Sequence, residues 1–128
     1  MVMLGVAAER VFDLLCDSLA KGLKDPAEHV AFERVLERNP MKPKLDWVHD
    51  KLRTLQDQRP RPTGFPENST LMVTAIYDLI RSQRNDFGHP RDLPPRMGRG
   101  DANANLEIFP RYYETAENLR KFLSTQKV

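Results

Sequence analysis

Apolar residues recur every three or four positions along five stretches of this chain, and none of these stretches shows a convincing strand pattern. The stretches cover about 3–23, 26–39 and 43–58, then run from Asn68 or Ser69 into the segment 81–90, and from 101 to about 123. The segments "QRPRPTGFPENS" (58–69) and "PRDLPPRMGRG" (90–100) separate the later ones, and their prolines and glycines cannot continue a helix. The sequence therefore predicts an all-α protein, an antiparallel bundle of four to five helices.

Length and composition place the chain in a narrow class. Its 128 residues predict a single helical domain over 1–128, and the 30% of charged residues suits a globular protein. No apolar run approaches the roughly 18 residues that span a bilayer, and the opening "MVMLGVAAER" lacks a basic leader region. Cys16 is the single cysteine, so no intrachain disulfide can form. We expect a cytoplasmic protein without a membrane partner.

The first helical stretch is apolar on two sides. Phe12, Cys16, Leu19 and Leu23 form a second stripe beside the main one. Such a helix lies at the centre of a bundle or is shared with a partner chain. No capping residue precedes it, so we expect the domain to be the C-terminal part of a longer protein.

Several residues predict how the helices begin and bend. The expected N-caps are Asp25 for the second helix, Asn68 or Ser69 for the fourth and Asp101 for the last. Glu28 is placed to complete a capping box with Asp25. Pro110 should kink or split the last helix. His29 and His49 lie among charged neighbours, which favours surface or capping roles, and the sequence predicts no metal and no cofactor.

The stretch "RSQRNDFGHP" (81–90) holds the candidate chemistry, because Arg84, Asn85 and His89 stand close together in it. On one ideal helix Arg84 and His89 would point about 140° apart. They can meet if the helix ends between them, as Gly88 and Pro90 favour, or if a second chain supplies one of the pair. The alternative is an ordinary helix end, where these residue types are common.

A basic surface surrounds this stretch. Between positions 81 and 100, five arginines face only two aspartates: Arg81, Arg84, Arg91, Arg96 and Arg99 against Asp86 and Asp92. Such a surface can hold phosphate although the net charge of the chain is only +2. Arg81 and Arg91 are therefore candidate binding residues, and the alternative is a solvated basic loop.

The pattern Arg84-Asn85, three residues, then His89, in a helical domain of this length, resembles the HEPN superfamily. "RNDFGHP" followed by "ANLEIFPRYY" is similar to one prokaryotic branch of HEPN-like proteins, and "MLGVAAERVFDLL" also fits that branch. The resemblance implies a helical bundle that forms a homodimer, in which the two motifs face each other in a composite site. It also implies metal-independent cleavage of RNA.

The resemblance gives each site residue a role. His89 would act as general base or acid, and Arg84 would stabilise the phosphate in its pentacoordinate state. Asn85 would orient either the histidine or the phosphate. Attack by the 2′-hydroxyl would leave a 2′,3′-cyclic phosphate and a 5′-hydroxyl. Glu9, on the first helix, would approach the cleft as a further site residue. The alternative interpretation is that Glu9 is an ordinary surface residue of the helix.

The expected function is thus an endoribonuclease in a toxin or defence setting, with an antitoxin or a nucleotidyltransferase as a further partner. In some family members that transferase modifies a tyrosine two residues after the histidine. Here that position is Arg91, so the modification does not carry over. The alternatives are a non-catalytic module that binds nucleotide or RNA or assembles with a protein, and a helical dimer with only a structural role.

Overall fold

The computed structural model describes residues 2–88 and 99–128, with side chains described over 5–82 and 107–128. The described residues form five helices and no strand: α1 (Val2–Gly22), α2 (Pro26–Leu36), α3 (Met41–Asp57), α4 (Ser69–Gly88) and α5 (Arg99–Thr125). The all-α class and the helical bundle are therefore confirmed. None of these helices is both long and apolar enough to cross a membrane.

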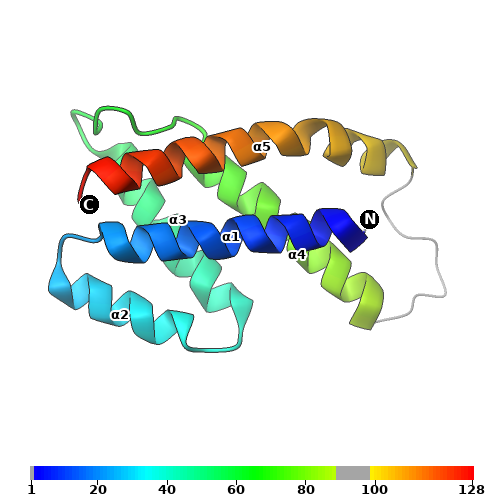
Figure 1. Cartoon of the computed structure of the whole chain (residues 1–128), viewed down its shortest axis with the longest axis horizontal. Coiled ribbons are helices and arrows are strands. Elements are labelled where there is room, and N and C mark those ends of the chain that lie inside the picture. The colour runs from blue at the N-terminus through cyan, green and yellow to red at the C-terminus, as the bar shows by residue number, and fades with distance from the viewer. Residues whose placement is uncertain (1, 89–98) are drawn as a thin grey trace.

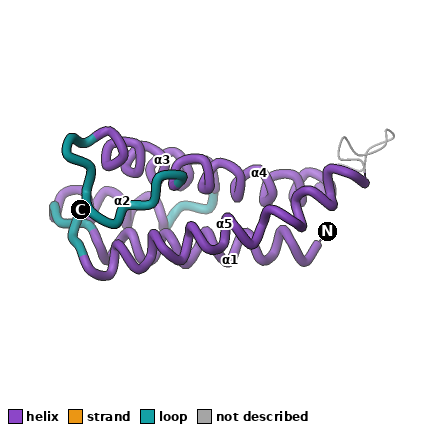
Figure 2. Tube along the Cα trace, turned by 90° about the horizontal axis from the view of Figure 1, so that it is seen from above, coloured by secondary structure: helices purple, strands orange, loops and turns teal. Residues whose placement is uncertain are grey.

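The helices lie in two layers. Figures 1 and 2 show α1 and α5 side by side in one layer, with α3 and α4 behind them. Helices α1 and α5 run in the same direction, because Ser18 contacts Arg120 and Gly22 approaches Leu123 near the C-terminal end of both. Helix α4 runs in the opposite sense and packs against α1, α3 and α5, whereas α2 packs against α1 and α3 (Figure 1).

Helix α1 is the centre of the core. Phe12, Cys16, Leu19 and Leu23, its second apolar stripe, are at most 6% exposed, as are Val11 and Leu15 of the first stripe. The chain itself thus encloses both stripes with α2, α4 and α5. Of the two explanations that the sequence left open, the central position in the bundle is confirmed.

The close approach of α1 to α5 requires a glycine at position 22. A Cβ atom there would lie 3.2 Å from the Leu123 carbonyl oxygen and 3.4 Å from the Leu123 Cβ atom. Real Cβ contacts are seldom that short with backbone, so a side chain at this position would push the two helices apart.

The last carbonyl groups of α1 are bound by donors from elsewhere in the chain. The pairs are His29 Nδ1 with the Ala20 oxygen at 2.8 Å, Lys127 Nζ with the Lys21 oxygen at 2.7 Å, and the Val128 amide with the Gly22 oxygen at 2.8 Å. His29 therefore has the capping role that its position predicted, in the tautomer that carries its proton on Nδ1. These contacts satisfy oxygen atoms that a helix end leaves without partners.

Helix α2 is attached to α3 by one ring stack and one ion pair. Asp25 caps α2 as predicted, accepting a hydrogen bond of 3.0 Å from the Ala27 amide. Glu28 does not complete a capping box with Asp25, because its carboxylate pairs with Lys51 of α3 at 3.0 Å. The Phe32 ring stacks on Trp47 with 4.3 Å between the ring centroids.

Several predicted boundaries were wrong by a few residues. Helix α2 ends at Leu36 rather than near 39, since Pro40 already has the extended backbone that begins α3. Helix α3 begins at Met41 and carries Pro43 in its first turn, where the missing amide proton costs nothing. Of the two predicted caps of α4, Asn68 takes the N-cap position, since its carbonyl accepts from the Met72 amide at 2.9 Å. The Ser69 hydroxyl instead donates to the Pro66 carbonyl at 2.8 Å.

Helix α5 also differs from its prediction. It begins at Arg99, so Asp101 lies inside its first turn and is not the N-cap. Pro110 does not split it, because one helix continues from Arg99 to Thr125 through that residue. Among the described side chains of α5, the buried ones, Ala116, Leu119, Phe122 and Leu123, all follow the proline and pack this part of the helix into the core.

The ring stack gives a test of the fold. Phe32 is fully buried, so Phe32→Ala should lower the free energy of unfolding by about 3–5 kcal/mol. Urea denaturation followed by the fluorescence of Trp47, the single tryptophan, measures this change directly. Val30→Ala on the same helix is the control, because Val30 is 49% exposed and should cost less than about 0.5 kcal/mol. Equal costs for the two variants would show that α2 is not held by the stack.

Candidate functional site

The last turns of α4 carry two of the three residues of the predicted catalytic motif. Arg84 and Asn85 lie in α4, which spans Ser69–Gly88 and so runs into the motif segment, as the sequence predicted. Position 84 follows Ile80, which is buried, by one helical turn, and position 85 follows Arg81 in the same way. His89 and Arg91 lie outside the described residues.

The predicted binding residue Arg81 lies on the exposed side of α4. Its guanidinium is 3.6 Å from the carboxylate of Asp78, one turn earlier, and both side chains are more than half exposed. Such an exposed pair contributes little to stability, so it leaves Arg81 able to exchange Asp78 for another anion.

Glu9, the remaining predicted site residue, lies on α1 with a half-buried side chain. Helices α1 and α4 pack against each other, and Figure 1 shows the N-terminus of α1 and the end of α4 at the same end of the molecule. The fold therefore brings the helices that carry Glu9 and Arg84 together.

Cys16 is not a candidate nucleophile. Burial raises the pKa of its thiol to about 12, and the nearby negative charge of Asp13 raises it further than the positive charge of Lys44 lowers it. A thiol acts as a nucleophile or a metal ligand only as thiolate, so Cys16 stays inert at neutral pH. Within residues 5–82 and 107–128, no group of three or more His, Cys, Asp or Glu side chains is placed to hold a metal ion.

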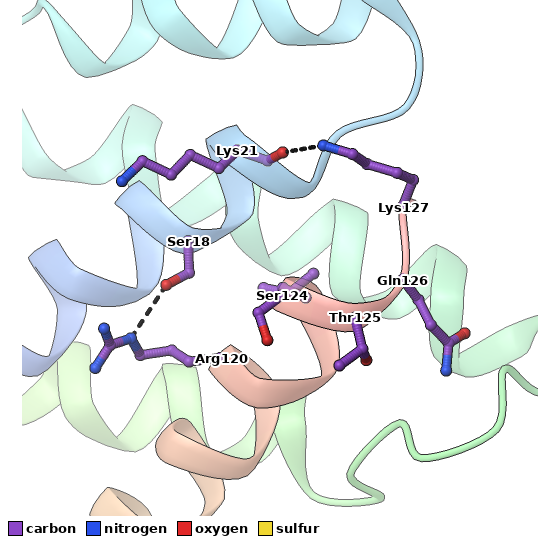
Figure 3. A pocket seen from close by; sticks show the side chains of 8 residues that line it. Ser18, Lys21, Arg120, Ser124, Thr125, Gln126 and Lys127 are labelled. Carbon is purple, nitrogen blue, oxygen red and sulfur yellow. Dashed lines mark hydrogen bonds between the residues drawn. The ribbon is translucent and has the colours of Figure 1, made fainter.

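A second site, which the sequence did not predict, lies where α1 and α5 end together. A pocket of about 310 Å³ opens there, lined by Ser18, Lys21, Arg120, Leu123, Ser124, Thr125, Gln126 and Lys127 (Figure 3). The Arg120 guanidinium is fixed on two sides, because Nε donates to Ser18 Oγ at 3.1 Å and Nη1 to Glu117 at 2.8 Å. Ser18 and Arg120 are 102 positions apart, so no local sequence motif predicts their contact.

No protein-family model, curated protein sequence or solved structure gives a significant match to this chain. The functional interpretation therefore rests on the residues themselves and on their positions in the fold.

The Cys16 environment gives a second test. Because the folded state raises the thiol pKa from its ordinary value of 9.0 to about 12, a thiol reagent at pH 8 should modify the native protein far more slowly than the protein in guanidinium. The same shift means that the thiol contributes stability below pH 9, which is lost as the pH rises toward 12. Equal modification rates in the native and unfolded protein would show that Cys16 is accessible.

Proposed function

We propose that the chain is a metal-independent endoribonuclease of HEPN type, acting in the cytoplasm in a toxin or defence setting. The observation that carries the proposal is the motif Arg84-Asn85-(x)3-His89, whose first two residues lie in the last turns of α4. Two further features support it: the described fold is helical throughout, and the helix that carries Glu9 packs against α4.

The reaction needs few groups, because RNA carries its own nucleophile. One imidazole accepts the 2′-hydroxyl proton while O2′ attacks the phosphorus, and the bond from phosphorus to O5′ breaks. A second imidazole, in its protonated form, gives a proton to the departing O5′. Arg84 binds the non-bridging oxygens, which gain negative charge in the pentacoordinate state. The products are a 2′,3′-cyclic phosphate and a 5′-hydroxyl.

Two imidazoles in one cleft require two chains, because each chain has a single His89 and its other histidines lie on α2 and α3. A two-fold homodimer would supply both at once. The proposed active form is therefore a homodimer with a composite site, and a protein antitoxin that separates or covers the motifs would silence it.

The central test is cleavage of single-stranded RNA by purified variants. Removal of the acid–base group in His89→Ala should lower the rate by about 10²–10⁴-fold. Loss of the cation in Arg84→Ala should lower it by about 10²–10³-fold. Cleavage should persist in EDTA, and a 2′-deoxy substitution at the cleaved nucleotide should abolish it.

Matched controls lie on α3. His49→Ala and Arg53→Ala remove the same side-chain types from positions outside the motif, and both variants should cleave at the wild-type rate. If the motif variants retain full activity, the nuclease proposal is wrong. RNA or nucleotide binding without turnover, even with excess protein, would instead identify a non-catalytic binding module.

A mixing experiment tests whether the two chains share one site. Wild-type and His89→Ala chains are unfolded together in equal amounts and refolded. Only dimers of two wild-type chains hold both imidazoles, and they make up a quarter of the random mixture, which predicts about a quarter of the rate of the same total amount of wild type. A site contained within one chain would instead give about half of that rate, because half of the chains are wild type.

A further inference from the structure

The pocket between the ends of α1 and α5 lies far from the proposed catalytic motif. Arg84 and Asn85 lie in the last turns of α4, whereas the pocket is lined by the last turns of α1 and α5, which end at the opposite end of the molecule (Figures 1 and 3). Helix α5 runs from the one end to the other, and at 1.5 Å per residue the steps from Arg99 to Arg120 span about 30 Å. Whatever binds here is not in contact with the reacting phosphate of the same chain.

Hydrogen-bond donors point into this pocket without partners in the described chain. Arg120 uses Nε and Nη1 internally, which leaves both protons of Nη2. Ser18 accepts from Arg120 through its oxygen, so its hydroxyl proton remains available. Figure 3 shows Lys21 and Arg120 extending in the same direction on either side of Ser18. Two cations therefore lie on either side of one hydroxyl at the pocket.

The groups that would repel an anion are occupied or replaceable. The last carbonyl oxygens of α1 already have donors, and on α5 the Ser124 and Thr125 hydroxyls donate to the Lys121 and Phe122 carbonyls at 2.7 and 3.0 Å. The Asp17 carboxylate lies 3.2 Å from Lys21 Nζ, but these side chains are 63% and 77% exposed. A pair so exposed is weak, and a ligand can replace Asp17.

The orientation of the Arg120 guanidinium is fixed by its contacts within the chain. Its side chain is 32% exposed, and the contacts with Ser18 and Glu117 hold the plane of the guanidinium before any ligand arrives. A guanidinium group held in one orientation can donate two hydrogen bonds to the oxygens of a phosphate and loses little side-chain entropy on binding. The pocket volume is at the lower end of ligand sites, which suits a single nucleotide.

We propose that this pocket binds a phosphate group of a nucleotide, held by Arg120, Ser18 and Lys21. On the proposed function, on which this part of the inference rests, that phosphate belongs to the RNA backbone at a distance from the cleaved bond. The pocket then contributes to RNA affinity and does not take part in the chemical step.

The test uses the His89→Ala protein, so that RNA stays intact while its binding is measured. A fluorescein-labelled single-stranded RNA of about 20 nucleotides, long enough to exceed the typical footprint of one small domain, is titrated by fluorescence anisotropy. Arg120→Gln should weaken binding roughly three- to tenfold. It should also reduce the slope of log K against log salt by about 0.7, the value for one lost phosphate contact.

Two further variants separate the pocket from general charge and from folding. Lys121→Gln makes the same charge change on an exposed neighbour that does not line the pocket, and it should leave affinity nearly unchanged. Ser18→Ala removes one hydroxyl without any charge change, so it should weaken binding but keep the salt slope. If Lys121→Gln weakens RNA binding as much as Arg120→Gln does, or if both pocket variants bind RNA like their parent, the pocket is not a site for the RNA backbone.

A titration with AMP identifies the source of the phosphate. Binding of both RNA and AMP that depends on Arg120 supports the backbone site. AMP binding that depends on Arg120, with RNA binding unchanged, makes a free nucleotide the ligand and overturns the link to RNA. If the wild type does not cleave RNA but Arg120→Gln weakens binding, the nuclease proposal fails and the pocket stands. If the wild type cleaves and Arg120→Gln cleaves with unchanged KM, the pocket proposal fails and the nuclease stands.

Discussion

The enclosure of α1 determines the rest of this fold. A helix with apolar residues on two sides cannot face water along either of them, so other helices must cover both. Helix α5 covers one side and can do so closely because Gly22 leaves room for the Leu123 carbonyl. Helices α2 and α4 contact α1 elsewhere. The positions of these three neighbours therefore follow from the need to bury both apolar sides of one helix.

Much of this architecture could be predicted from the sequence, because helical periodicity and proline breaks are local signals. Asp25 with Pro26 marks the start of α2 correctly, and the segment 58–69 separates α3 from α4 as expected. The errors arose where tertiary contacts decide between local options. Glu28 is as close to Asp25 as a capping box requires, yet Lys51 of another helix takes its carboxylate. Pro110 would disturb an isolated helix, whereas in α5 it is accommodated.

The two candidate sites differ in how far the sequence reveals them. Arg84, Asn85 and His89 lie within six positions and can therefore be recognised as a local sequence motif. Helix α4 runs into this motif, as the sequence predicted. The α1/α5 pocket has no such signal, because Ser18 and Arg120 become neighbours only when the first and last helices pack side by side. Spacing along the chain can propose a local motif, but it cannot propose a pair that tertiary packing alone creates.

The side-by-side packing of α1 and α5 also has a consequence for the order of events during synthesis. Ribosomes add roughly 5–20 residues per second, so the hundred or so positions between the paired turns of α1 and α5 take about 5–20 seconds to appear. Until α5 emerges, the α1 surface that Leu119, Phe122 and Leu123 help to bury has no cover. A nascent chain would therefore hold this apolar side of α1 uncovered while the segments from α2 to α5 are synthesised, and this part of the core would close only after α5 has left the ribosome.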